Sequence, residues 1–271
     1  MHSHPNTRIA VLVDTSSAWG RRLIHGVLAY EKKHGPWDVW IEPRGQKEPP
    51  RLPKGWNGDG IIARVSTQSI ADKLAKLQVP VVNVSGIRIE GVNYPRVCTN
   101  NNKFAEVAVN HFVDRGLANI AYIGLSGREY SLDRQRSVAR VCEQANCRFD
   151  VYRRAKNLAI ESQWERQRAS IGLWLKRLTK PVGVITWGVR LGSDVIEEAV
   201  HHGMSVPDEV AVLGEDDELL CEAVQPSLSG VVIASEQIGI EAATMLDQLM
   251  QRKKLKNKEL ALEPTGIVSR V

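Results

Sequence analysis

Continuous apolar runs alternate with amphipathic segments along most of this chain, and they do so in two successive groups. The first group contains RIAVLVD (8–14) and GIIARV (60–65), and the second contains NIAYIG (119–124), VGVIT (182–186) and VAVLG (210–214). Runs that are apolar without alternation are typical of strands buried on both faces of a parallel sheet, and the segments between them have a helical period. The sequence therefore predicts an α/β fold built as two sheets with a cleft between them.

Turn residues mark the ends of several predicted helices. Gly35-Pro36 follows one amphipathic segment and Gly116 follows another, and neither sequence continues a helix well. Prolines and glycines also fill the stretch 42–60, which predicts a long surface loop. The longest predicted helices span 18–34, 101–115, 161–178 and 235–252, and a terminal strand is predicted at 266–271.

The composition is that of a globular protein that is not bound for a membrane. Hydrophobic residues make up 43% and charged residues 25%, which excludes a disordered or fibrous chain. No apolar run approaches the roughly 18 residues of a membrane span, and the N-terminal MHSHPNTR lacks the apolar core of a signal peptide. We therefore expect a cytoplasmic protein with no membrane partner. The net charge of +5 permits contact with nucleic acid without arguing for it.

The chain carries no recognisable enzyme motif or metal-ligand spacing. It lacks G-x-x-x-x-G-K-[ST], G-x-G-x-x-G, G-x-S-x-G and H-E-x-x-H, and its four cysteines include no C-x-x-C. The acidic stretch 215–218 is the strongest metal candidate, but consecutive side chains fan apart on a loop. We expect no catalytic residues, no metal and no cofactor.

Polar and aromatic side chains gather just after the predicted strands. They are Asp14, Trp19 and Arg64 in the first half, and Ser126, Trp187 and residues 215–218 in the second. Open α/β sheets bind ligands at the carboxyl ends of their strands. Carboxylates, arginines and hydroxyls hydrogen-bond a polyhydroxylated ligand, and a tryptophan face covers the C–H face of a sugar ring. Any one of these residues could instead be a helix cap, a turn former or core, so the inference rests on several strand ends together.

Longer stretches resemble a known family. The segments that resemble the LacI/GalR-type sugar-sensing domain, which has the type I periplasmic-binding-protein fold, are VCTNNNKFAEVAVNHFVDRGLANIAYIG (97–124), VGVIT (182–186), MSVPDEVAVLGEDDELL (204–220) and PSLSGV (226–231). Two others, SSAWGRRLIHGVLAYEKKHGPWDVWIEPRG (16–45) and WNGDGIIAR (56–64), are similar to the sensor half of xylose-operon regulators, in which an AraC-type DNA-binding domain follows the sensor. The resemblance covers nearly the whole chain.

The resemblance implies two Rossmann-like subdomains that close on a monosaccharide, in a protein that forms a homodimer. Mapped onto this sequence, the N-terminal lobe comprises 7–116 and 235–263, and the C-terminal lobe comprises 117–232 and 264–271. The DNA-binding domain would lie beyond residue 271, so DNA contact is expected only through a domain absent from this chain. The expected effector is a small sugar, with a pentose favoured.

The resemblance also implies ligand contacts, some of which this chain has lost. Arg134 is kept at a position that reaches the sugar in the family, and Asp216 is kept within the family's Gly-x-Asp-Asn stretch. Asn100-Asn101 stands where the family has Asp-Asn, and Gly188-Val189 where it has Asn-Asp, which removes two carboxylates. Each lost charged hydrogen bond costs about 1.5–3 kcal/mol. We predict that the ligand-binding residues are Asp14, Trp19, Arg64, Asn100, Arg134 and Asp216.

These observations favour an effector-binding domain of a transcription regulator, for a xylose or other pentose operon, that closes on its ligand between two lobes. Two alternatives stay open. The lost carboxylates are also typical of a degenerate sensor that acts by constitutive dimerisation. An α/β sugar-processing enzyme would need a nucleophile or a phosphate loop that the sequence does not show.

Overall fold

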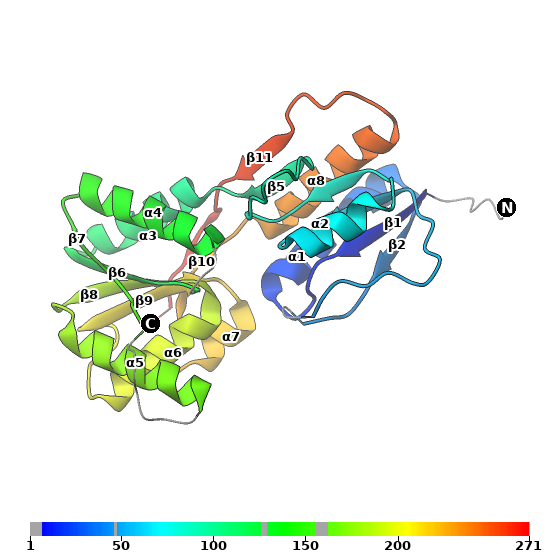
Figure 1. Ribbon diagram of the computed structural model, residues 1–271. Coiled ribbons are helices and arrows are strands. Elements are labelled where there is room, and N and C mark those ends of the chain that lie inside the picture. Colours follow the sequence, from blue (N-terminus) through cyan, green and yellow to red (C-terminus); the bar gives the residue numbers. More distant parts are fainter. Residues whose placement is uncertain (1–6, 46–47, 126–128, 155–161, 271) are drawn as a thin grey trace. The chain divides into compact units, whose positions relative to one another are not determined.

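The computed structural model describes residues 7–45, 48–125, 129–154 and 162–270, which form two compact units (Figure 1). Unit 1 comprises Met1–Asn100 and Ala234–Glu263, and unit 2 comprises Asn101–Ile233 and Pro264–Val271. The chain passes from one unit to the other after Asn100, Ile233 and Glu263. Each unit contains a six-stranded sheet within the described residues, which confirms the predicted α/β class with its two sheets rich in parallel strands.

The sheet of unit 1 is parallel throughout, in the order β11-β5-β4-β3-β1-β2. Its strands are β1 (Thr7–Leu12), β2 (Trp37–Ile41), β3 (Gly60–Ala63), β4 (Val81–Asn83), β5 (Arg96–Thr99) and β11 (Glu259–Leu262), and its helices are α1 (Ala18–His34), α2 (Gln68–Ala75) and α8 (Ser235–Met250). The central strands β1 and β3 are almost wholly buried because their apolar runs are covered on both faces.

Helices α1 and α8 pack unusually close to each other in unit 1, at two glycines. A Cβ atom at Gly26 would lie 1.9 Å from the carbonyl oxygen of Glu236, and one at Gly239 would lie 2.1 Å from that of Leu23. The Tyr30 hydroxyl donates a hydrogen bond of 2.9 Å to Asp247 Oδ2 at the same helix pair. The return of the chain after residue 233 therefore completes unit 1 by placing α8 beside α1.

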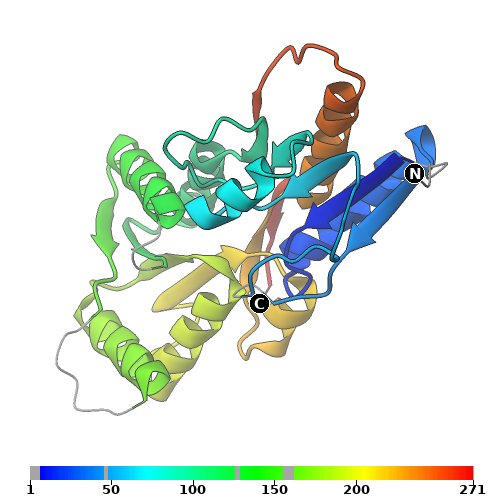
Figure 2. The ribbon, with the colours of Figure 1, turned by 45° about the vertical axis from the view of Figure 1, so that its right-hand side comes forward.

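The sheet of unit 2 has the order β12-β10-β9-β8-β6-β7, with only the pairing of β12 to β10 antiparallel. Figures 1 and 2 show α3 and α4 on one side of this sheet and α5 and α6 on the other. The strands are β6 (Asn119–Ile123), β7 (Arg148–Val151), β8 (Val182–Thr186), β9 (Val210–Glu215), β10 (Ser229–Val232) and β12 (Gly266–Val268). The helices are α3 (Asn101–Val113), α4 (Glu129–Gln144), α5 (Gln163–Arg177), α6 (Gly188–His201) and α7 (Glu218–Ala223).

Helix α3 belongs to unit 2, whereas the predicted N-terminal lobe ran on to residue 116. The apolar face of α3 packs against α4 and the unit 2 sheet, and the Phe112 ring lies 2.5 Å from where a Cβ atom of Gly183 in β8 would be. The Phe112 ring fits at this position only because residue 183 is glycine. Since α3 packs in unit 2, the first passage between the units comes directly after Asn100 instead of after Gly116. None of the described helices is long and apolar enough to span a membrane.

Candidate functional site

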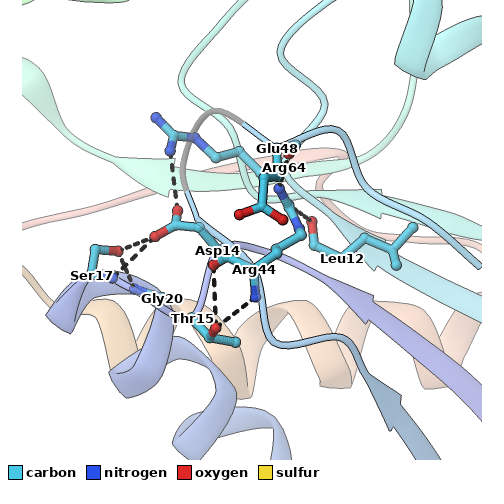
Figure 3. A network of polar contacts seen from close by, with 8 residues as sticks. All are labelled: Leu12, Asp14, Thr15, Ser17, Gly20, Arg44, Glu48 and Arg64. Carbon is cyan, nitrogen blue, oxygen red and sulfur yellow. Dashed lines mark hydrogen bonds and ion pairs between the residues drawn. The ribbon is translucent and has the colours of Figure 1, made fainter.

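The loop after β1 fixes a buried carboxylate at the start of α1 (Figure 3). Asp14 Oδ1 accepts hydrogen bonds from the Ser17 backbone N (3.2 Å) and from Ser17 Oγ (2.5 Å). Ser17 is also the N-cap of α1, because its Oγ accepts from the Gly20 backbone N at 3.1 Å. Residue 20 must be glycine here, since a Cβ atom would lie 1.7 Å from the Asp14 carbonyl oxygen. The Asp14 side chain is only 2% exposed.

Arg64 follows β3 and lies over this carboxylate. Its Nη1 donates to Asp14 Oδ2 at 3.3 Å, and its guanidinium carbon lies 5.4 Å from the centre of the Trp19 ring. The Arg64 side chain is 27% exposed, so the arginine and not the acid is available to a ligand. We call Asp14, Ser17, Trp19 and Arg64 the Arg64 cluster.

Arg44 borders the Arg64 cluster, although sequence reasoning placed it only in a long surface loop. Its backbone N donates to Thr15 Oγ1 at 2.9 Å, and its guanidinium donates to the carbonyl oxygens of Leu12 (3.1 Å) and Glu48 (2.7 Å) (Figure 3). Burial lowers the pKa of the Arg44 guanidinium, while the Asp14 carboxylate acts in the opposite direction. Arg44 therefore ties the loop to the end of β1.

A second cluster surrounds Arg134 of α4 in unit 2. The guanidinium carbon lies 3.9 Å from the centre of the Phe104 ring and 4.0 Å from that of Trp187, so the cation contacts two aromatic rings. Its Nε donates to Asn101 Oδ1 at 3.1 Å, and its Nη1 pairs with Glu215 Oε1. We call Asn101, Phe104, Arg134, Trp187 and Glu215 the Glu215 cluster.

Two members of the Glu215 cluster, Glu215 and Trp187, lie at strand ends. Glu215 is the last residue of β9, and Trp187 follows β8. Gly188 then adopts a φ of +74°, a conformation that favours glycine, and its carbonyl oxygen accepts from Thr186 Oγ1 at 3.1 Å. The Trp187 ring also contacts Tyr130, with ring centres 5.0 Å apart. The exposed fraction of the side chain is 3% for Arg134 and 23% for Glu215.

Asp216 directly follows Glu215 but pairs with a different arginine. Its Oδ1 accepts from Arg270 Nη2 at 2.9 Å, and Arg270 Nη1 donates to the Leu228 carbonyl oxygen at 3.2 Å. The Asp216 side chain is 5% exposed. This pair holds the end of the chain beyond β12 against the loop before β10.

The structure thus divides the six predicted ligand-binding residues. It brings Asp14, Trp19 and Arg64 together in one cluster and places Arg134 in the other. Asn100 is the last residue of unit 1, where its backbone N donates to the Leu262 carbonyl oxygen at 2.8 Å, and Asp216 pairs with Arg270.

Sequence reasoning missed Arg44 and Phe104, and it considered Glu215 only as part of the acidic stretch 215–218. Phe104 was assigned to an apolar helix stripe, and Glu215 was passed over because the family resemblance favoured its neighbour.

Val189, where the family has a carboxylate, packs against the hydrophobic core of unit 2. Ser126 lies outside the described residues. Within the described ranges, no group of three or more His, Cys, Asp or Glu side chains is placed to hold a metal.

Each of the two α/β units carries an arginine–carboxylate pair beside a tryptophan. Residues 109–271 match the periplasmic binding protein-like domain, and residues 8–102 match the XylR N-terminal domain. The chain belongs to the periplasmic binding protein-like family.

Individual relatives agree with this family. The chain is 26% identical to the xylose operon regulatory protein of Escherichia coli strain K12, over 97% of this chain and 68% of that protein. It is 24% identical to the protein of the same name from Haemophilus influenzae, over 97% and 69%. A solved structure of the xylose-binding transcription activator XylR superposes with a TM-score of 0.83 at 25% identity, covering 100% of this chain and 70% of the other. The names of these relatives describe operon regulators and a transcription activator.

Proposed function

We propose that this chain is the effector-binding part of a transcription regulator and that its effector is a neutral sugar, with D-xylose the first to test. The observation that carries the proposal is the chemistry of the two clusters: each combines a tryptophan with an arginine–carboxylate pair. Two relatives are named as xylose operon regulators, which supports the choice of sugar.

Each cluster offers what a sugar ring needs. A carboxylate accepts hydrogen bonds from hydroxyl groups, and a guanidinium donates to hydroxyl oxygens. The apolar face of a ring packs on an indole such as Trp19 or Trp187. Of the residues predicted from sequence, Trp19 and Arg64 are assigned to direct sugar contact, and the buried Asp14 and Arg134 to holding the groups that make it.

The cellular setting follows from the same proposal. Such a regulator acts in the cytoplasm, as a homodimer, and makes its DNA contact through a separate domain. Binding of operator DNA by this chain alone at moderate salt would contradict the proposal that a separate domain contacts the DNA.

The test is titration calorimetry of the chain against D-xylose, L-arabinose, D-ribose and D-glucose, with thermal unfolding as a second readout. We expect one pentose to bind most tightly and to raise the melting temperature. Arg64→Met should weaken that binding by about tenfold or more, which corresponds to about 1.4 kcal/mol. The matched control is Arg88→Met, because Arg88 is a highly exposed arginine that pairs with the partly exposed Glu259. No heat and no thermal shift with any sugar would contradict the proposal.

A second candidate, a degenerate sensor that has lost its sugar, is favoured by one observation. Val189 is apolar and packs against the unit 2 core, where the family has a carboxylate. Val189→Asp discriminates between the two. Sugar binding gained only in this variant would favour degeneration, whereas pentose binding by the unmodified chain that the variant weakens would favour a working sensor.

A further inference from the structure

The two clusters differ in which member of the arginine–carboxylate pair is exposed. In the Arg64 cluster the acid is buried and the arginine is exposed, with side-chain values of 2% for Asp14 and 27% for Arg64. In the Glu215 cluster the arginine is buried and the acid is exposed, with values of 3% for Arg134 and 23% for Glu215. Unit 1 therefore offers a cation to a ligand, and unit 2 offers an anion.

Glu215 has spare hydrogen-bonding capacity. Its Oε1 pairs with Arg134, while Oε2 takes part in no hydrogen bond within the part of the chain that the structure describes. The neighbouring carboxylate of Asp216 is almost fully buried and is already engaged by Arg270. Of these two acids, Glu215 is the one that can accept a hydrogen bond from a bound hydroxyl group.

The two charges within the Glu215 cluster balance each other. Asn101, Phe104 and Trp187 are uncharged, and Arg134 is the cation that pairs with Glu215. Tyr122 lies close enough to interact with both charged groups, but burial raises its pKa to about 12 and keeps it neutral at physiological pH. An approaching anion therefore meets the carboxylate of Glu215 before it meets the buried guanidinium, and like charges repel most where water is excluded.

We propose that Glu215 is a specificity-determining residue that accepts a hydrogen bond from a neutral sugar and excludes sugar acids. The proposal rests on the proposed function, since it concerns the same ligand. It departs from the family resemblance, which pointed to Asp216 as the acid that contacts the sugar.

The experiment compares Glu215→Gln with the unmodified chain by calorimetry, using D-xylose, D-glucose and D-glucuronate. D-glucuronate differs from D-glucose by a carboxylate in place of a hydroxymethyl group, so this pair isolates the charge. We expect the variant to lose about tenfold or more in D-xylose affinity. We also expect its affinity for D-glucuronate relative to D-glucose to rise by about tenfold or more, because the charge of Arg134 is no longer balanced.

Two further variants separate charge from shape and folding. Glu215→Asp keeps the charge on a shorter side chain, so it should weaken D-xylose binding while still excluding D-glucuronate. Glu222→Gln removes an exposed carboxylate of α7 and should change neither property. If Glu215→Gln fails to fold, the role of Glu215 is tested on the unmodified chain, by measuring how well D-glucuronate and D-glucose compete with D-xylose at low and at high salt. Added salt should then raise its affinity for D-glucuronate more than that for D-glucose, because salt screens the repulsion.

Each outcome has one meaning. Unchanged D-xylose affinity and unchanged exclusion of D-glucuronate in Glu215→Gln would overturn the role of Glu215 and leave the proposed function standing. If Glu222→Gln changed the affinities for D-xylose and D-glucuronate as much as Glu215→Gln does, the effect would be one of overall charge, and the specific role of Glu215 would be overturned. If the unmodified chain binds none of the sugars, the proposed function fails, and this inference fails with it.

Discussion

The Arg64 cluster and the Glu215 cluster use the same ion pair in opposite ways. Asp14 is buried and receives hydrogen bonds from Ser17 N, Ser17 Oγ and Arg64. Arg134 is buried between two aromatic rings and donates to Asn101 and Glu215. A buried charge is tolerated only with such a set of partners. The comparison teaches that the buried member of each pair is a structural support, and that the exposed member is the group a ligand can reach.

The largest effect is expected from removing the buried arginine. Arg134→Met leaves Asn101 and Glu215 without their donor and removes the cation between Phe104 and Trp187, so the free energy of unfolding should fall by about 2–4 kcal/mol. Urea unfolding measures it. Arg136→Met is the control on the same helix, because Arg136 pairs with Asp133 at the surface, and it should cost less than about 0.5 kcal/mol. Equal losses in both variants would show that Arg134 is not a buried support.

Removing the buried acid of unit 1 should cost less. Asp14→Ala deletes the acceptor of the two Ser17 hydrogen bonds, but it leaves an arginine that is already partly solvated. We expect a loss of about 1–2 kcal/mol in the free energy of unfolding. Asp38→Ala, at an exposed ion pair with Arg8, is the control. If Asp14→Ala lost more free energy of unfolding than Arg134→Met, the buried acid of unit 1 would be the stronger support, contrary to our expectation.

Asp216→Asn tests whether the acid next to Glu215 is outside the cluster. The amide keeps an acceptor for Arg270, so the free energy of unfolding should fall by about 1 kcal/mol and the D-xylose affinity should change by less than about twofold. Chemical denaturation and calorimetry provide the two values. If this variant lost more sugar affinity than Glu215→Gln, the family resemblance would be right and our assignment wrong.

The smallest change in stability is expected at Trp19. Its ring lies 5.4 Å from the Arg64 guanidinium carbon, against 4.0 Å for Trp187 and Arg134, and Arg64 is the more solvated cation. Trp19→Leu should therefore lower the free energy of unfolding by only about 0.5 kcal/mol, and Trp187→Leu should lower it by more. Thermal unfolding of the two variants side by side gives the order, and a larger loss at Trp19 would refute it.

The fold was predictable because the buried strands are apolar runs long enough to recognise. RIAVLVD, NIAYIG and VGVIT all become strands of the two sheets. The assignment of α3 was not predictable, because its apolar face fits either unit until the space beside Gly183 is known. The sequence marks the face of a helix, but not the sheet that the face will cover.

The candidate site was predictable in its location but not in its acid. Successive residues at the end of a strand point to opposite sides, so Glu215 and Asp216 must face different surroundings. Glu215 pairs with Arg134 of α4, and Asp216 pairs with Arg270 near residue 271. Both arginines are remote in sequence from the two acids, so the sequence alone does not say which acid meets which arginine. Arg44 gave no local signal, because its role depends on where a proline-rich loop returns to β1.

Calorimetric titration of D-xylose into the unmodified chain, Arg64→Met and Glu215→Gln tests most directly the claim that the exposed member of each pair is the group that a neutral sugar contacts. We expect the unmodified chain to bind D-xylose and each of the two variants to lose about tenfold or more in affinity, while Arg88→Met and Glu222→Gln leave it unchanged. D-xylose affinity that survives either substitution intact would contradict this claim.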